Sequence, residues 1–182
     1  MFYMEISTTK LKVIIRYFCT NTDSRFLGKV KLMKLFYFLD FLHVKRYGTP
    51  VTFDTYIHLE HGPIPSKILN LVTGVVDNEE DAILSDTIYI EKPEGIKMQR
   101  IHCIQPFEER DKKVFSDREL KILKEICDRF GDQSTKSIED ISHLEAPWSM
   151  TKETQTIPYS LAAQDQDSKF SEEEIEMLTT VI

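Results

Sequence analysis

The feature that most constrains this fold is a stretch of apolar residues between Lys29 and Tyr47. If the stretch forms a helix, apolar side chains cover more than one of its faces, which is typical of a helix buried in the middle of a protein. Gly48 is well placed to end such a helix, and Pro50 follows it. We therefore predict a central buried helix over residues 29–47. Its apolar residues are Val30, Leu32, Met33, Leu35, Phe36, Phe38, Leu39, Phe41, Leu42 and Val44.

The same stretch does not predict a membrane span. Its most apolar part, residues 32–44, is interrupted by Lys34, Asp40 and His43, and it is shorter than the ~20 residues that a span requires. No signal-peptide pattern opens the sequence. The three cysteines are Cys19, Cys103 and Cys127. They are far apart and form no CxxC pair, which favours a reducing compartment, so we expect a cytoplasmic protein.

Apolar spacing and helix caps predict the other helices. They span residues 8–20, 66–76, 116–131 and 137–144, with a last helix that begins at residue 171. Thr8 or Thr9 can cap the first of them. Ser116 with Glu119, and Ser171 with Glu174, have the spacing of capping boxes, in which the two side chains satisfy each other's free backbone amides.

Extended structure is predicted in fewer places. Residues 83–91 and 97–105 alternate apolar and polar positions around a Pro-Gly turn, which indicates a β-hairpin. Residues 51–60 could form a strand or an extended lead-in. Residues 61–65 read as a rigid loop, because each proline fixes its own φ and keeps the preceding residue out of a helix. The polar residues 155–168 indicate a loop or a loosely held arm.

The predicted fold class is α+β, mainly α: a helical domain around the central buried helix, with one small β-hairpin. A chain of 182 residues fits one domain. We expect residues 1–154 to form that domain and residues 155–182 to form an acidic C-terminal arm with a short final helix.

Charge is distributed unevenly along the chain. The net charge is −7, but the first 50 residues carry +6 and the remainder carries −13. The acidic majority repels phosphate backbones, so nucleic-acid binding is disfavoured. The basic residues near the N-terminus are either the solvated faces of two helices or a local basic patch. They are Lys10, Lys12, Arg16, Lys29 and Lys31.

Few residues suggest catalysis or metal binding. Asp40 and His43 are three apart on the central helix and therefore share a side, where they form either an acid/base couple or a satisfied polar pin. His58 and His61 form an HxxH pair, but no HExxH or zinc-finger spacing occurs. The only tryptophan, Trp148, either fills the core or anchors a partner. No phosphate-binding or nucleophile-elbow motif is present, so we predict no catalytic site, metal or cofactor.

Three sequence segments together resemble the Panacea domain, also called the SocA-like antitoxin domain. Residues 34–43 read KLFYFLDFLH, residues 61–66 read HGPIPS, and residues 142–148 read SHLEAPW. The family typically shows K-L-x-Y-F-x-D-x-x-H, then H/Y-G-P-x-P-S, then S/T-H-x-x-x-x-W, and the resemblance covers roughly residues 8–150. The matching positions are Tyr37, Asp40, His43, His61, Gly62, Pro63, Pro65, Ser66, His143, Pro147 and Trp148.

The resemblance implies an antitoxin that binds a cognate toxin protein and blocks it by direct contact. It also implies an alternative, because the SocA type delivers its toxin to a Clp-type protease. Some members carry an added DNA-binding segment, for which this chain has no residual length. A second alternative from the residues themselves is a hydrolase that uses Asp40, His43, His61 or His143.

Overall fold

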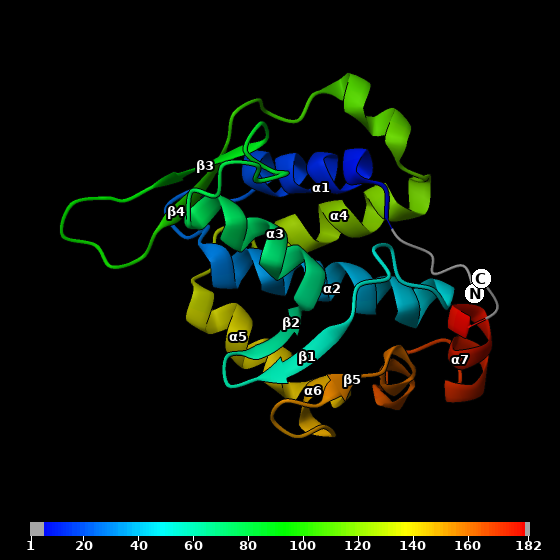
Figure 1. The fold of residues 1–182 in the computed structure, drawn as a ribbon. Coiled ribbons are helices and arrows are strands. Elements are labelled where there is room, and N and C mark those ends of the chain that lie inside the picture. The colour runs from blue at the N-terminus through cyan, green and yellow to red at the C-terminus, as the bar shows by residue number, and fades with distance from the viewer. Residues whose placement is uncertain (1–5, 181–182) are drawn as a thin grey trace.

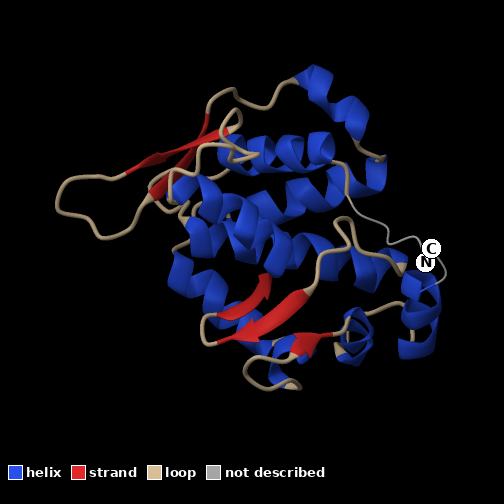
Figure 2. Cartoon of the chain, in the orientation of Figure 1, coloured by secondary structure: helices blue, strands red, loops and turns tan. Residues whose placement is uncertain are grey.

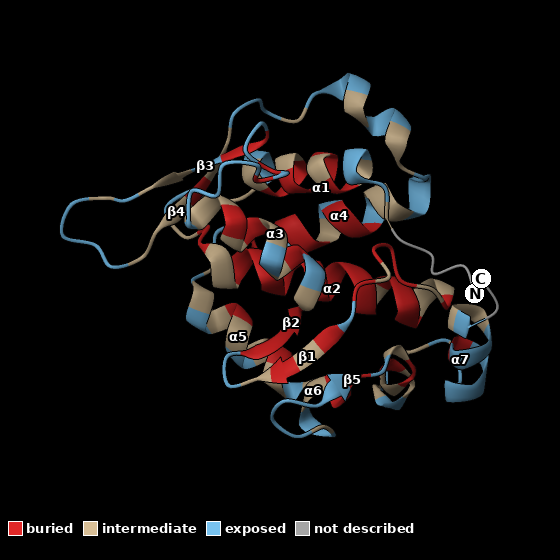
Figure 3. Ribbon diagram, viewed as in Figure 1, coloured by how far each residue is buried: buried red, intermediate tan, exposed pale blue. Residues whose placement is uncertain are grey.

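Helix α2 (Lys29–Tyr47) is the centre of the computed structural model, which describes residues 6–180 (Figure 1). Most of its residues are buried, including the whole run from Lys31 to Phe41 (Figure 3). Its N-terminal residue follows Gly28, and Gly48 ends it in the left-handed conformation with φ 80°, donating its N–H to the Val44 carbonyl at 2.8 Å. The predicted central buried helix is confirmed.

Helices α1 (Thr8–Asn21) and α4 (Asp117–Phe130) pack along one side of α2, above it in Figure 1. Phe18 meets Phe36 edge-on, with ring centroids 5.3 Å apart, and Phe38 stacks on Phe130 at 4.5 Å. The short helix η1 (Glu109–Val114) precedes α4.

The caps of these two helices differ in how well the sequence predicted them. The Ser116–Glu119 capping box at the start of α4 is confirmed. The predicted cap of α1 is wrong by one residue: Ser7 has the extended backbone that a cap needs, and its hydroxyl accepts the Lys10 N–H, whereas Thr8 and Thr9 already lie within the helix.

A three-stranded antiparallel sheet lies on the other side of α2, in the order β2-β1-β5. Its strands are β1 (Tyr56–Leu59), β2 (Gly62–Pro65) and β5 (Thr156–Ile157). The predicted loop over residues 61–65 is therefore wrong from Gly62 onward. Proline is tolerated in β2 because β2 is an edge strand, where a missing N–H breaks no second ladder. Pro63 lies opposite His58, and Pro65 lies opposite Tyr56.

The predicted β-hairpin is confirmed as a separate two-stranded sheet. It consists of β3 (Ile88–Glu91) and β4 (Arg100–Cys103), which pair antiparallel with Ile88 opposite Cys103. Helix α3 (Ser66–Val76) connects the two sheets. Helices make up most of the chain (Figure 2), so the fold class α+β, mainly α, is confirmed, with a second small sheet in addition to the hairpin.

Helices α5 (Thr135–Leu144) and α6 (Ala146–Ser149) follow α4, and helices η2 (Tyr159–Gln164) and α7 (Glu172–Thr180) follow β5. The loose loop predicted for residues 155–168 is wrong, because β5 pairs with β1 and the Tyr159 hydroxyl donates to the Asp54 carbonyl at 2.7 Å. The apolar residues of segment 155–168 are too few to show a periodicity, so the sequence pattern alone did not indicate this structure. The Ser171–Glu174 cap of α7 is confirmed. Within residues 6–180, no helix is long and apolar enough to cross a bilayer.

Candidate partner-binding site

The structure places the predicted site residues in three groups. Tyr37 and Asp40 on α2 contact Tyr56 of β1, whereas His43 faces the charges of Glu119, Lys10 and Arg118 on α4 and α1. Contacts of α2 with β2 and α5, of β2 with α5, and of α5 with α6 join the groups. The groups are Tyr37, Asp40 and His43 on α2; His61, Gly62, Pro63, Pro65 and Ser66 in and beside β2; and His143, Pro147 and Trp148 in α5 and α6.

Asp40 is completely buried and holds the segment that leads into β1. Its Oδ1 accepts the backbone N–H groups of Val51 at 2.7 Å and Thr52 at 2.8 Å, and its Oδ2 accepts the hydroxyls of Thr52 and Tyr56. Burial raises the pKa of Asp40 to about 6, although these hydrogen bonds oppose the rise. A carboxylate with four donors is a satisfied polar pin, the structural reading of this residue.

His43 contacts a different segment from Asp40. Its Nδ1 lies 2.5 Å from the Thr49 carbonyl, and its ring packs against Tyr47 with centroids 4.8 Å apart. Burial lowers the pKa of His43. His43 binds Thr49, just after the end of α2, and Asp40 binds residues 51–56. The two side chains therefore hold the segment between α2 and β1 at two separate points.

Lys34 is a buried residue of this site that was not among the predicted positions. Its Nζ donates to the Pro63 carbonyl at 2.8 Å, and burial lowers its pKa to about 7 against the opposing charge of Glu139. The sequence signal was a lone cation inside an apolar stretch. Gly62 lies directly over it with φ 96°, and a Cβ there would be 2.9 Å from Lys34 Nζ and 2.8 Å from Ser142 Oγ.

Trp148 is held between two histidine rings. The His143 ring stacks on it at 3.9 Å with a 14° interplanar angle, and the His58 ring stacks on it at 4.4 Å with a 20° angle. Its indole N–H donates to the Leu59 carbonyl at 3.4 Å, and His58 Nδ1 lies 2.9 Å from Thr151 Oγ1. Burial lowers the pKa of His143. Trp148 remains half-buried, so it both joins α6 to β1 and reaches the surface.

A charged cluster ties α2 to the C-terminal part of the chain. The Tyr37 hydroxyl donates to Glu145 Oε2 at 2.8 Å, and Lys45 Nζ lies 3.0 Å from Glu145 Oε1 and 2.9 Å from Asp165 Oδ2. Asp167 is 3.2 Å from the same nitrogen. Burial works to lower the pKa of Lys45, but the carboxylates of Glu145 and Asp165 outweigh it and raise that pKa. Sequence reasoning missed Lys45 and Glu145, because their partners are distant along the chain.

The remaining predicted residues divide into scaffold and surface. Asp54 caps α3 by accepting the N–H groups of Lys67 at 3.0 Å and Ile68 at 2.8 Å, so Ser66 begins that helix without capping it. Pro147 is buried in the first turn of α6. His61 differs from both: its side chain is 62% exposed, and its Nδ1 lies 3.6 Å from Glu139 Oε2.

The groups weighed for hydrolysis have separate surroundings. No hydrogen bond or ion pair within residues 6–180 joins any two of Asp40, His43, His61 and His143. Across the same residues, no group of three or more histidine, cysteine, aspartate or glutamate side chains is arranged to hold a metal ion.

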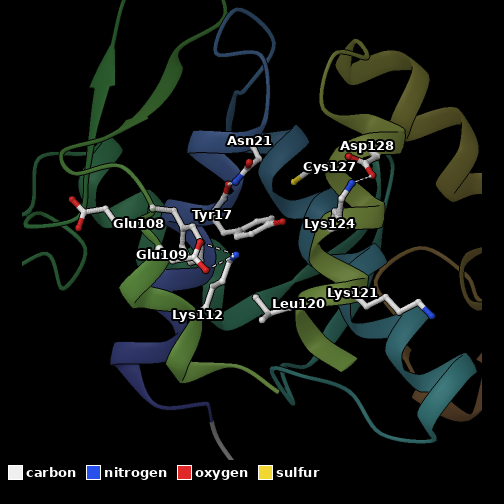
Figure 4. Close-up of a pocket in the computed structure, with 11 residues that line it drawn as sticks. Tyr17, Asn21, Glu108, Glu109, Lys112, Leu120, Lys121, Lys124, Cys127 and Asp128 are labelled. Atoms are coloured by element: carbon white, nitrogen blue, oxygen red, sulfur yellow. Dashed lines mark hydrogen bonds and ion pairs between the residues drawn. The ribbon is translucent and has the colours of Figure 1, made fainter. Parts of the chain in front are cut away.

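A cleft of about 630 Å³ lies elsewhere, between α1, η1 and α4 (Figure 4). Tyr17 is at its centre, and burial raises the pKa of this tyrosine to about 12. Two lysines at its rim are paired: Lys112 with Glu109 at 2.8 Å and Lys124 with Asp128 at 2.5 Å. The cleft contains none of the predicted site residues.

Comparison with known protein families gives a match. Residues 32–149 match the model of a family described as antitoxin SocA-like, Panacea domain. The match begins inside α2, ends at the last residue of α6 and includes all the predicted site residues. No curated protein and no solved structure matches the chain.

Proposed function

Because the chain belongs to the family of SocA-like antitoxins with a Panacea domain, we propose that it binds a cognate toxin protein and neutralises it by direct contact. The observation that carries the proposal is the match over residues 32–149, which spans the frame from α2 to α6. Most motif side chains in that frame, such as Asp40 and Pro147, are buried and hold the fold. Contact with the toxin then depends on what the frame presents at its surface.

The surface that we assign to the toxin surrounds the half-buried Trp148. We call it the Trp148 face and define it by His61, Leu144, Trp148 and Met150. Leu144 is 83% exposed and Met150 is 58% exposed, so two large apolar side chains lie in solvent next in sequence to the His143–Trp148 stack. Exposed apolar side chains near a tryptophan are typical of binding hot spots.

The net charge of the chain after residue 50 favours a basic partner. Glu60 and Glu153 are exposed and neighbour the face in sequence, whereas Asp140 is paired with Lys136 at 2.6 Å and Lys152 is exposed beside Glu153. The chain after residue 50 carries a net charge of −13. A net negative charge favours association with a positively charged toxin surface, mainly by raising the association rate.

The alternative is delivery of the toxin to a Clp-type protease, for which a loosely held C-terminal arm would be suited. The described part of residues 155–182 is packed: β5 pairs with β1, Asp165 pairs with Lys45, and Ile175 is completely buried. This packing favours neutralisation by contact over delivery.

The test is co-expression of the full chain with the product of the neighbouring gene. We expect that product to arrest growth alone and the chain to restore growth. The double variant Leu144→Ser/Met150→Ser should weaken binding at least about tenfold, or roughly 1.4 kcal/mol. Met177→Ser is the matched control, because Met177 is 59% exposed but lies on α7. Affinity is measured by titration calorimetry.

Three results would contradict parts of this proposal. If the neighbouring product is not toxic alone, or if the chain gives no rescue, the antitoxin function is wrong. If rescue occurs only when the protease is present and toxin abundance falls, delivery replaces direct neutralisation. If the double variant binds as tightly as Met177→Ser, the Trp148 face is not the contact surface.

A further inference from the structure

Two of the three cysteines lie together although they are distant in sequence. Cys19 is near the end of α1, and Cys103 is the last residue of β4. The Cys19 thiol hydrogen-bonds to the sulfur of Cys103, and Thr20 Oγ1 lies 4.0 Å from the same sulfur. Both residues are half-buried, so solvent reaches the pair.

The approach of the two thiols is fixed by the segment that follows Cys103. The Arg16 side chain donates to the carbonyls of Gln105 at 3.1 Å and Pro106 at 2.5 Å. Thr20 Oγ1 accepts the Phe107 N–H at 2.8 Å. The chain after β4 is therefore fastened to the same two turns of α1 that carry Cys19.

The surroundings divide the two thiols into a nucleophile and a partner. The hydrogen bond from Cys19, helped by Thr20 and the positive charge of Arg16, lowers the pKa of Cys103 to about 6, which favours the thiolate form of Cys103. The same hydrogen bond raises the pKa of Cys19, which keeps its proton. A solvent-reachable thiolate beside a second thiol is the arrangement of redox-sensing cysteine pairs.

We propose that Cys19 and Cys103 form an oxidation-sensitive pair that closes to an intramolecular disulfide when a peroxide reaches it. This inference is independent of toxin binding. The resulting bond would link α1 covalently to β4.

The chemistry balances with hydrogen peroxide as oxidant. The Cys103 thiolate attacks one peroxide oxygen, the O–O bond breaks, and hydroxide leaves, which gives a sulfenic acid on Cys103. The Cys19 sulfur then attacks the Cys103 sulfur, and the S–O bond breaks. The hydroxyl group leaves as water with the Cys19 proton. Two thiols and one peroxide thus give one disulfide and two waters, and the sulfurs are oxidised as the peroxide is reduced.

The experiment treats the full chain with a small excess of hydrogen peroxide at neutral pH. Free thiols are then counted under denaturing conditions, and the linked peptides are identified by mass spectrometry. We expect the wild type to fall from three thiols to one, with a Cys19–Cys103 peptide pair. Cys127→Ser is the matched control: Cys127 is buried in α4, and burial raises its pKa to about 12, so this variant should still form the bond.

Variants of the pair separate its two roles. Cys19→Ser should accumulate a sulfenic acid that a dimedone probe labels, and Cys103→Ser should retain its two thiols. Cys103→Ala repeats the second measurement if the serine variant unfolds, and circular dichroism checks each fold. Three thiols remaining in peroxide-treated wild type would overturn the proposal. A peptide pair that contains Cys127 would also overturn it.

Discussion

The side-chain nitrogen of Lys34 donates a hydrogen bond to the backbone carbonyl of Pro63, with 2.8 Å between the nitrogen and the oxygen. The lysine is completely buried in the second turn of α2, and the proline lies in the edge strand β2. A prolyl residue has no N–H but keeps its carbonyl, so this contact attaches β2 to the central helix.

Replacing Lys34 with methionine should change how stability depends on pH. Burial lowers the pKa of this lysine from 10.5 to about 7, so between these values the unfolded chain binds more protons than the folded chain. The free energy of unfolding therefore rises with pH across that window. We expect wild type to gain about 3 kcal/mol relative to Lys34→Met between about pH 7 and pH 9.5, measured by urea unfolding.

Lys121, which is exposed on α4, provides the control for this measurement. Lys121→Met should follow the wild type at both pH values. A Lys34→Met variant whose stability changes with pH in parallel with the wild type would show that the lysine titrates normally.

Adding a single methyl group at Gly62 should destabilise the protein more than the same change at Gly95. Both glycines have positive φ, 96° and 74°, which costs a residue with a Cβ about 1–2 kcal/mol. At Gly62 the Cβ would also press on Lys34 Nζ and Ser142 Oγ, which adds about 1–3 kcal/mol, whereas nothing lies within 4 Å of the Cβ at Gly95. Thermal unfolding of Gly62→Ala and Gly95→Ala measures the difference, and equal losses would contradict the close packing over Lys34.

Removing the cation at Lys45 should leave three carboxylates facing one another. Glu145 and Asp165 are mostly buried, and Lys45 is 3% exposed, so Lys45→Met should cost about 3 kcal/mol. Lys124→Met breaks an ion pair whose side chains are 70% and 63% exposed and should cost less than about 0.5 kcal/mol. Urea unfolding of both variants measures these costs, and a Lys45→Met loss as small as that of Lys124→Met would show that the cluster is solvated.

The sequence predicted those parts of the fold that depend on neighbouring residues. Helix α2 was predicted from apolar residues on more than one of its faces, and the cap at Ser116 was predicted from a partner three residues away. Strand β2 was missed because Pro63 and Pro65 indicate a turn locally, and only the pairing with β1 makes them an edge. Strand β5 has two residues, too few for any alternation, and it forms because β1 offers it a partner.

The candidate site shows the same division. Gly62 and Trp148 were found because their residue types are informative alone or in a short motif. The stacking of His58 on Trp148 and the pairing of Lys45 with Asp165 join residues about 90 or more positions apart in sequence. No local pattern encodes which of several histidines or lysines meets a given partner, so these contacts required the structure.

The pairing of β5 with β1 sets the shortest recombinant fragment that keeps the three-stranded sheet complete. The family match ends at Ser149, but Ile157 lies opposite Tyr56 in the strand next to the proline-rich edge. A recombinant fragment trimmed to the matched residues would lose β5. Strand β1 would then be an exposed edge strand that can pair with strands of other molecules. Fragments that end at Ser149 should therefore aggregate. Crystallisation and binding experiments are best begun with all 182 residues.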